Sequence, residues 1–264
     1  MLPEVDDPIW QRICEESRIH AQDEPVLASY IHATILNHPR IERSLSFLLA
    51  NQLDSPAASS LLLREVMLEA FEADPWILDC VRADLLAILD RDSATHELYV
   101  PFLYYKGFHA LQAQRVSHWL WQQGRRALAL FFQNRVSTKF GVDIHPAAHI
   151  GKGVMLDHAT GLVIGETAVV GNNVSILQSV TLGGTGKEDG DRHPKIGDGV
   201  LISAGAKILG NITVGEGAKV GAGSVVLDPV PAHTTVAGVP AKVVGKPATD
   251  QPALDMDHCL PCCD

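Results

Sequence analysis

The sequence predicts an α+β fold: an all-helical N-terminal domain followed by a left-handed parallel β-helix of six-residue repeats. The glycines divide the chain, since 20 of the 22 lie in residues 141–245 and only Gly107 and Gly124 precede them. From Ile144 onwards an aliphatic residue recurs every six positions, and such a fixed internal period indicates a solenoid. We therefore expect a helical domain over residues 1–140, a β-helix domain over 141–245 and a flexible C-terminal tail over 246–264.

Helical signals cover the first domain. Asp7 followed by Pro8 is typical of a helix N-cap and its first turn, and Asp74 followed by Pro75 separates two helices. Roughly six to eight helices are expected from the apolar stripes, which should form the core. The residues that recur at helical spacing are Leu61, Leu62, Met67, Ala70, Phe71, Ile77, Val81, Leu85 and Leu89, with a further stripe across residues 111–132.

The six-residue repeat predicts which side chains point into the β-helix. An aliphatic residue stacks inside each face of such a coil, while glycine and small residues allow tight corners between short strands. The repeat slips by two residues after Leu156 and is interrupted after Leu182. The predicted inward residues are Ile144, Ile150, Leu156, Ile164, Val170, Ile176, Leu182, Ile196, Ile202, Ile208, Val214, Val220 and Val226.

The interruption predicts a loop that is extruded from the coil. Its sequence, GGTGKEDGDRHPK at residues 183–195, is rich in glycine and charge. Binding sites are often built on loops that a rigid scaffold positions. Because three-faced coils expose flat sides, we also expect assembly about a threefold axis.

Composition argues against several classes of protein. The net charge is −10 and no segment is basic, so nucleic acid is not an expected partner. There is no signal-peptide pattern and no run of 18 apolar residues, which predicts a cytoplasmic protein without a membrane anchor. The five cysteines are too few and too uneven for a disulfide framework. Metal-ligand types gather near the end, at His258, Cys259, Cys262 and Cys263, but a short polar tail offers no scaffold to fix a metal site.

Five motifs, in order, resemble those of the bacterial serine acetyltransferases. They are DIHPAA at 143–148, LDHATG at 156–161, QSVTLGGTGK at 178–187, DRHPKI at 191–196 and AGVPAK at 237–242. The resemblance extends from the helical domain to about Pro247. It implies transfer of acetyl from acetyl-CoA to the hydroxyl of L-serine, the first step of cysteine biosynthesis from serine. It also implies a homohexamer, a dimer of trimers joined by the helical domains, and feedback inhibition by L-cysteine at the serine site.

A hydroxyl nucleophile needs a general base, and histidine suits this task because its ordinary pKa lies near neutrality. Among the 12 histidines the best candidate is His158, which lies beside the inward stack and between small residues. Asp143 lies fifteen residues earlier; with eighteen residues per coil, the two fall on neighbouring coils at nearby corners. The resemblance implies that they form a catalytic dyad, with Asp143 orienting the imidazole. The alternative is an exposed coil histidine and an aspartate that caps the domain junction.

Four further residues are candidates for binding serine or cysteine. Arg192 can hold a substrate carboxylate with its planar guanidinium, and His193 can donate a hydrogen bond to the substrate or to the developing charge. The resemblance assigns Asp157 and Asp92 to the ammonium group of serine. From the sequence alone, Asp92 is an ordinary acid at a helix end.

For the coenzyme, glycine and small residues allow close approach of the backbone. Gly183, Gly184 and Thr185 offer amide donors near the reacting carbonyl, and the pantetheine arm is expected along Ala204, Gly205, Ala222 and Gly223. Lys219 and Lys242 are the candidate cations for the phosphates. A lysine on a solvated coil is otherwise a solubilising residue.

Other activities use the same scaffold. An acetyltransferase for a sugar or xenobiotic hydroxyl differs only in its acceptor, although the helical domain and Arg192 favour an amino acid. A zinc carbonic-anhydrase-like enzyme would use His158 and His193 but needs a third histidine, and residues 195–205 contain none; no metal is therefore expected. The non-enzymatic alternative is a structural trimer, which would not bind acetyl-CoA.

The last residues depart from the family pattern. Related enzymes commonly end in an isoleucine that inserts into O-acetylserine sulfhydrylase, whereas this chain ends CLPCCD and has no isoleucine after Ile212. Three interpretations stay open: a different docking mode, no docking, or an altered tail.

Overall fold

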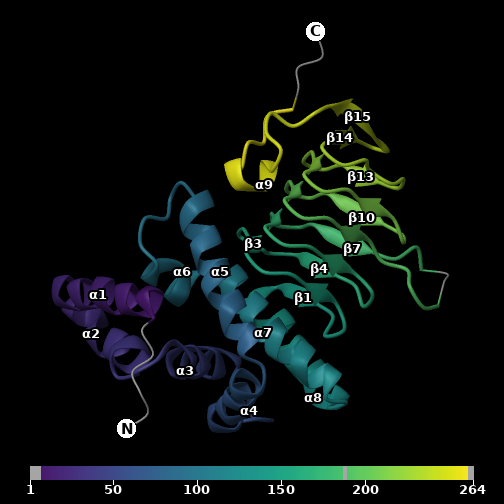
Figure 1. The fold of residues 1–264 in the computed structure, drawn as a ribbon. Coiled ribbons are helices and arrows are strands. Elements are labelled where there is room, and N and C mark those ends of the chain that lie inside the picture. The colour runs from purple at the N-terminus through teal and green to yellow at the C-terminus, as the bar shows by residue number, and fades with distance from the viewer. Residues whose placement is uncertain (1–6, 187–188, 261–264) are drawn as a thin grey trace.

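The computed structural model describes residues 7–186 and 189–260, and it has two parts of different construction (Figure 1). The N-terminal part is helical, and the C-terminal part is a stack of short strands. The helices are α1 (Pro8–Asp23), α2 (Pro25–Ile31), the π-helix η1 (His32–Leu36), α3 (Ile41–Leu53), α4 (Ser60–Ala73), α5 (Pro75–Arg91), α6 (Tyr99–Tyr104), α7 (Lys106–Gln122) and α8 (Arg126–Phe140).

The predicted helix signals are found at helix starts. The Asp7 carboxylate accepts a hydrogen bond from the backbone N–H of Trp10 at 3.1 Å, and the Asp74 carboxylate accepts one from Trp76 at 3.2 Å. Each caps an orphan N–H of the first turn. One part of the predicted core is wrong: Leu61 and Leu62 are 67% and 61% exposed. They lie in the first turn of α4, whose buried face is instead formed by Leu63, Met67, Ala70 and Phe71.

The C-terminal part is a parallel β-helix with three faces, which confirms the predicted fold class. Face 1 contains β1 (Val142–Ile144), β4 (Leu162–Ile164), β7 (Thr181–Gly183), β10 (Lys207–Leu209) and β13 (Val225–Val226). Face 2 contains β2 (His149–Ile150), β5 (Val169–Val170), β8 (Lys195–Ile196) and β11 (Thr213–Val214). Face 3 contains β3 (Met155–Leu156), β6 (Ser175–Ile176), β9 (Leu201–Ile202), β12 (Lys219–Val220) and β14 (Thr235–Gly238), with β15 (Ala241–Gly245) antiparallel at its end.

The strand register explains the irregularities of the repeat. Regular coils pair residues 18 apart, as in Ile196 with Val214. The first coil pairs Ile144 with Ile164, because its last corner carries two extra residues. The second pairs Val170 with Ile196, because residues of the extruded loop are inserted there. All thirteen predicted inward residues are at most 6% exposed, so the aliphatic stack is continuous despite both insertions.

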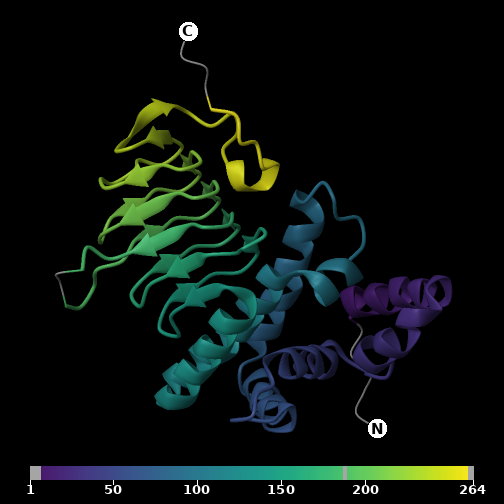
Figure 2. The same cartoon turned by 180° about the vertical axis from the view of Figure 1, so that it is seen from behind.

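A buried polar joint holds the helices against the first coil. The Asp84 carboxylate of α5 accepts hydrogen bonds from Arg115 of α7 at 2.7 Å and from the Val154 N–H at 2.9 Å. Arg115 in turn donates to the carbonyls of Ile150 and Gly151. A charge removed from water needs such complete pairing. The joint fixes α5 and α7 against the lower coils (Figure 2).

The C-terminal segment folds back over face 3. After β15 the chain forms the short helix α9 (Pro252–Asp255), which contacts α5 and β9. The Ala253 carbonyl accepts a hydrogen bond from the Ser175 hydroxyl at 2.9 Å, and His258 lies 3.2 Å from the Ser203 hydroxyl. Cys262 and Cys263 lie outside the described residues.

Candidate active site

Most of the predicted site residues lie along two edges of the β-helix. The edge between faces 3 and 1, here called the His158 edge, consists of residues 157–161, 177–180, 203–206 and 221–224. Its corners stack through backbone hydrogen bonds, for example from the Ser179 N–H to the Thr160 carbonyl at 2.8 Å. The edge between faces 1 and 2, here called the loop edge, consists of residues 145–148, 165–168, 184–186, 189–194 and 210–212.

A tight corner of the backbone positions His158. His158 and Ala159 both adopt left-handed backbone angles, with φ of 52° and 58°, which costs roughly 1–3 kcal/mol per residue. The first turn of α7 holds this corner in place, because a Cβ at Gly107 would lie 2.0 Å from the Leu156 carbonyl oxygen. Lys106 also donates a hydrogen bond to the Thr160 hydroxyl. The turn leaves the His158 side chain 76% exposed at the edge.

His158 lines a pocket of about 430 Å³ between this corner and the helical part. Asp157 lies beside it, with 3.9 Å between its Oδ1 and the Nε2 of His158. Asp92, the residue that follows α5, lines the opposite side together with Tyr105. One pocket therefore contains the predicted base and both acids predicted to bind the ammonium group of serine.

Three hydrogen bonds hold the Asp92 carboxylate. Its Oδ2 accepts from the Thr95 hydroxyl at 2.7 Å and from the Tyr105 hydroxyl at 3.0 Å, and its Oδ1 accepts from the Ala94 N–H at 2.9 Å. Partial burial alone would raise the pKa of Asp92, but these hydrogen bonds outweigh burial and lower it. The pocket thus presents an oriented anion to any cation that enters.

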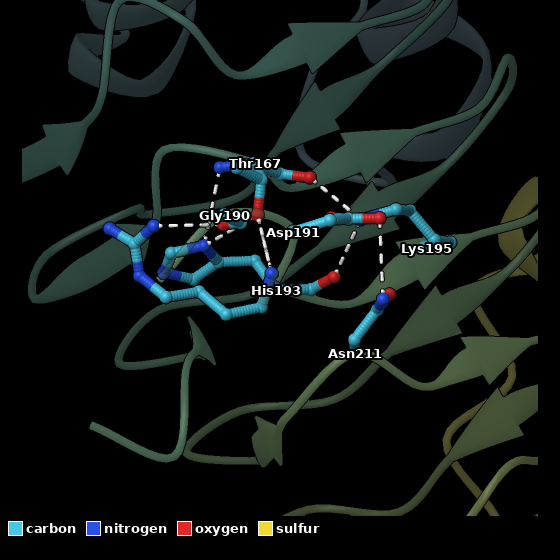
Figure 3. A network of polar contacts seen from close by, with 7 residues as sticks. Thr167, Gly190, Asp191, His193, Lys195 and Asn211 are labelled. Carbon is cyan, nitrogen blue, oxygen red and sulfur yellow. Dashed lines mark hydrogen bonds and ion pairs between the residues drawn. The ribbon is translucent and has the colours of Figure 1, made fainter. Parts of the chain in front are cut away.

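At the loop edge, Thr167 connects the extruded loop to the preceding coil (Figure 3). Its hydroxyl oxygen accepts hydrogen bonds from the backbone N–H groups of Arg192 at 3.0 Å and His193 at 3.1 Å. The Lys195 ammonium donates to the Thr167 carbonyl at 2.8 Å and to the Asp191 carboxylate at 2.5 Å. The base of the loop is therefore fixed although the loop leaves the coil.

The two predicted recognition residues of the loop have different surroundings. The Arg192 guanidinium donates to the Glu166 carboxylate at 2.8 Å, and this hydrogen bond lowers the pKa of Glu166. His193 is only 7% exposed. Burial lowers the pKa of His193, and the positive charge of Arg192 lowers it further, so the imidazole is neutral near pH 7.

The residues predicted to bind the coenzyme are divided between the edges. Gly183, Gly184 and Thr185 lie at the start of the loop, whereas Ala204, Gly205 and Ala222 lie on the His158 edge, in line with the base. Lys242 is exposed on β15. Lys219 is only 2% exposed, since the C-terminal segment covers it; its ammonium donates to the Cys259 carbonyl and lies 3.5 Å from Asp257.

Asp143 lies on β1, on the outer side of face 1, and accepts a hydrogen bond from Gln133 of α8 at 2.7 Å. Within residues 7–186 and 189–260 of a single chain, no hydrogen bond or ion pair joins Asp143 to His158. The residues of the loop edge are likewise separate from His158 in a single chain, since Arg192 and His193 do not line its pocket. One chain therefore presents two separate groups of candidate residues.

Sequence reasoning missed the residues that hold these groups. Thr95 and Tyr105 orient Asp92, while Glu166 and Thr167 hold the loop. Glu166 and Thr167 did carry a signal in the sequence. They are polar residues at the corner that follows Gly165, and the pairing of β4 with β7 places this corner one coil before the extruded loop. Thr95 and Tyr105 carried none, since their contact depends on how α7 packs.

In the described part of the chain, no three or more His, Cys, Asp and Glu side chains gather in a way that could hold a metal ion. Likewise, none of the described helices is both long and apolar enough to span a membrane.

Comparison with known proteins now adds to this geometry. The family profile "Serine acetyltransferase, N-terminal" matches residues 9–113, and a profile of bacterial transferase hexapeptide repeats matches residues 193–228. The serine acetyltransferase of Escherichia coli K12 is 62% identical over 250 residues, which cover 95% of this chain and 92% of the relative. The chain belongs to the serine acetyltransferase family.

Solved structures agree with this assignment. A serine acetyltransferase in complex with cysteine superimposes with a TM-score of 0.94 at 54% identity, covering 96% of this chain and 98% of its own. The Brucella abortus serine acetyltransferase in complex with coenzyme A superimposes with a TM-score of 0.90 at 53% identity, covering 91% and 96%. The chain is thus an acyltransferase that acetylates serine, and acetyl-CoA is its co-substrate.

Proposed function

We propose that the chain transfers acetyl directly from acetyl-CoA to the hydroxyl of L-serine, with His158 as the general base. His158 takes the hydroxyl proton while the serine oxygen attacks the thioester carbonyl. The C–S bond then breaks, and the imidazolium returns the proton to the leaving thiolate. The observation that carries this proposal is the pocket that holds His158, Asp157 and the oriented carboxylate of Asp92 together.

We propose further that each complete site forms between two neighbouring chains of a trimer. The His158 edge and the loop edge lie at opposite ends of face 1, and a face of about six residues spans roughly 20 Å. A single serine cannot touch both edges of one chain. A threefold assembly brings the loop edge of one chain to the His158 edge of the next. Arg192 and His193 then bind the carboxylate of serine, while Asp92 and Asp157 bind its ammonium group.

The same assembly accounts for the role of Asp143 as the residue that orients the imidazole. Asp143 faces outward from face 1, where the neighbouring chain would approach. A carboxylate bound to one ring nitrogen sets the tautomer in which the other nitrogen can accept the serine proton. We therefore assign Asp143 to the dyad across the chain boundary.

We propose that the coenzyme lies along the His158 edge. Ala204, Gly205 and Ala222 leave backbone groups accessible to the pantetheine amides, and Gly183, Gly184 and Thr185 of the adjoining loop edge lie near the reacting carbonyl. Lys242 is an exposed cation for the phosphates, and Lys219 becomes available to them when the C-terminal segment moves.

The wider assignments are proposals of the same kind. We propose a hexamer of two trimers joined by the helical domains, and inhibition by L-cysteine, which has the shape and charges of serine. We place the reaction in the cytoplasm, at the first step of cysteine biosynthesis; the free, buried thiols of Cys14 and Cys80 suit a reducing compartment. For O-acetylserine sulfhydrylase, a pull-down with and without residues 248–264 decides whether this tail binds it.

The test of the base is His158→Ala. We expect serine-dependent thiol release to fall by about 10²- to 10⁴-fold, the usual contribution of a positioned base, while acetyl-CoA binding measured by calorimetry stays close to that of the parent. The control is Lys152→Ala, an exposed coil residue outside both edges. Near-normal turnover in His158→Ala would remove His158 from its role.

A further inference from the structure

The ring of His193 is held from one side only. The backbone N–H of Thr167 lies 3.2 Å from its Nδ1, and the Thr167 hydroxyl oxygen lies 2.9 Å from the same atom. A backbone N–H can only donate, so Nδ1 must be the acceptor and cannot carry a proton.

The Thr167 hydroxyl strengthens this constraint. Its oxygen already accepts hydrogen bonds from the N–H groups of Arg192 and His193. With its lone pairs occupied by these donors, the hydroxyl has its own proton left to donate, and Nδ1 of His193 lies at 2.9 Å. The carboxylate of Asp191 is also near this hydroxyl, but the backbone donor alone already requires an unprotonated Nδ1.

The other ring nitrogen has no partner in the chain. Among the described residues none forms a hydrogen bond with Nε2, although His193 as a whole is only 7% exposed. The ring lies against Gly165, where a Cβ would be 2.0 Å from Nε2. Nε2 is therefore the ring nitrogen left free to donate to a substrate oxygen.

The charges around the ring favour the neutral form. Burial is the main cause that lowers the pKa of His193. Arg192 and Lys195 also oppose a positive charge on the ring, as does His145 when protonated, whereas Glu166 favours one. The imidazole is therefore uncharged near pH 7, with its single proton on Nε2.

We propose that Thr167 is the positioning residue that makes His193 a neutral Nε2–H donor to an oxygen of the amino-acid substrate. This inference rests on the proposed function of His193 in binding serine and cysteine. The inference adds three points to that function: Nε2 is the nitrogen that donates, the imidazole is uncharged when it donates, and Thr167 fixes the proton on Nε2. Arg192 then supplies the positive charge that attracts the substrate carboxylate, and His193 supplies a hydrogen bond of fixed direction.

The replacements that test this differ in which ring nitrogen their side-chain amide can replace. In His193→Gln the amide nitrogen can occupy the position of Nε2, so the substrate donor is kept. In His193→Asn the amide reaches only the position of Nδ1, where its oxygen can accept from the Thr167 N–H, so the contact with Thr167 is kept and the substrate donor is lost. His193→Ala removes both. The readouts are KM for serine, Ki for cysteine, KM for acetyl-CoA and kcat, with the thermal midpoint as a check of folding.

We expect His193→Ala and His193→Asn to raise KM for serine and Ki for cysteine by about 10- to 100-fold, the usual worth of a hydrogen bond to a charged group. We expect His193→Gln to raise them by less than about 5-fold. In all three variants KM for acetyl-CoA should stay near that of the parent.

A second pair of variants tests Thr167 itself. Thr167→Ser keeps the hydroxyl and should stay within about 3-fold of the parent, whereas Thr167→Val should raise KM for serine by about 10-fold while kcat at saturating serine changes little. A loop that merely unfolds would instead lower kcat and the thermal midpoint in Thr167→Val.

The outcomes separate this inference from the proposed function. If His193→Ala leaves KM for serine unchanged, His193 does not bind the substrate and the proposed function fails at this residue. If His193→Ala weakens serine binding but His193→Gln and His193→Asn weaken it equally, His193 binds the substrate but the inference about Nε2 is overturned. If Thr167→Val matches Thr167→Ser, the Thr167 hydroxyl does not position the ring, and the role proposed for Thr167 is overturned.

Discussion

The His158 edge and the loop edge of the β-helix present functional side chains by different means. At the His158 edge the backbone does the positioning, through two consecutive left-handed residues that the first turn of α7 holds in place. At the loop edge side chains do it, through the hydroxyl of Thr167 and the ion pair of Lys195 with Asp191. Each edge depends on a glycine, because a Cβ at Gly107 would lie 2.0 Å from the Leu156 carbonyl oxygen and a Cβ at Gly165 would lie 2.0 Å from Nε2 of His193.

The difference matches the role that we propose for each edge. A general base must hold its reacting atom within a fraction of an ångström, and a strained backbone corner provides that rigidity. Recognition of the substrate carboxylate tolerates small adjustments. An inserted loop can therefore carry Arg192 and His193 without disturbing the coil that carries His158. The predictions below test this separation of roles, starting with the largest effect.

Mixing two inactive variants tests whether the edges of different chains meet. His158→Ala and Arg192→Ala chains should each be nearly inactive alone. When trimers assemble at random from equal amounts, each trimer that contains both variants has one boundary at which an intact His158 edge meets an intact loop edge. About a quarter of all the sites are then complete. Co-expressed chains should therefore recover about a quarter of the parent activity in a thiol-release assay. If both edges acted within one chain, every site would lack one residue and activity would not return.

Gly107→Ala tests the rigidity of the His158 edge. The new Cβ would lie 2.0 Å from the Leu156 carbonyl oxygen, which is backbone and cannot rotate away. The corner that carries His158 must shift, so we expect kcat to fall by about 10²-fold, the scale for a misplacement of 1 Å. Steady-state kinetics measures this, with Ala127→Ser on the exposed side of α8 as the control. An unchanged kcat with an intact fold would show that the corner is not rigid.

Gly165→Ala is the matching change at the loop edge. Here the new Cβ would lie 2.0 Å from Nε2 of His193, which belongs to a side chain that can turn aside. We expect KM for serine to rise by about 10-fold as the His193 hydrogen bond is lost, with kcat much less affected than in Gly107→Ala. If both glycine variants lowered kcat equally, the two edges would not have separate roles.

The sequence predicted the scaffold because inward packing is a local, periodic property. Each of Ile144, Leu182 and Val226 occupies an equivalent place in a six-residue unit, and no long-range information is needed to find it. The correction at Leu61 and Leu62 has the opposite cause. Helical spacing alone does not say which of several adjacent leucines faces the core, and tertiary packing put Leu63 there.

The site was predictable only in part for a related reason. The family resemblance pointed to His158, Asp92 and Arg192. The eighteen-residue turn that related Asp143 to His158, however, took no account of the two extra residues in the first coil. Positioning residues such as Thr167 and Tyr105 act across coils or across the joint between helices and coil. Their roles depend on register and packing, which no single segment of sequence encodes.

Tyr105→Phe probes the smallest effect, the orientation of Asp92 at the His158 edge. The variant keeps the ring but removes one of three hydrogen bonds to the carboxylate, so we expect KM for serine to rise by about 5-fold near neutral pH. Tyr104→Phe is the control, because Tyr104 lines the same pocket and its hydroxyl does not contact Asp92 in the described hydrogen bonds.

The pH profile distinguishes orientation from simple loss of contact. Hydrogen bonds lower the pKa of Asp92, so removing one must raise that pKa towards its ordinary value. As pH falls, the variant then loses its anion, and with it serine affinity, at a higher pH than the parent does. Protonation of the base His158 dominates the acid limb of kcat/KM, so the readout is the equilibrium affinity for serine, measured by calorimetry as the pH falls. The loss of affinity should move to higher pH in Tyr105→Phe and stay in place in Tyr104→Phe. A loss that stays in place, or moves to lower pH, in Tyr105→Phe would mean that the Tyr105 hydroxyl does not stabilise the Asp92 carboxylate.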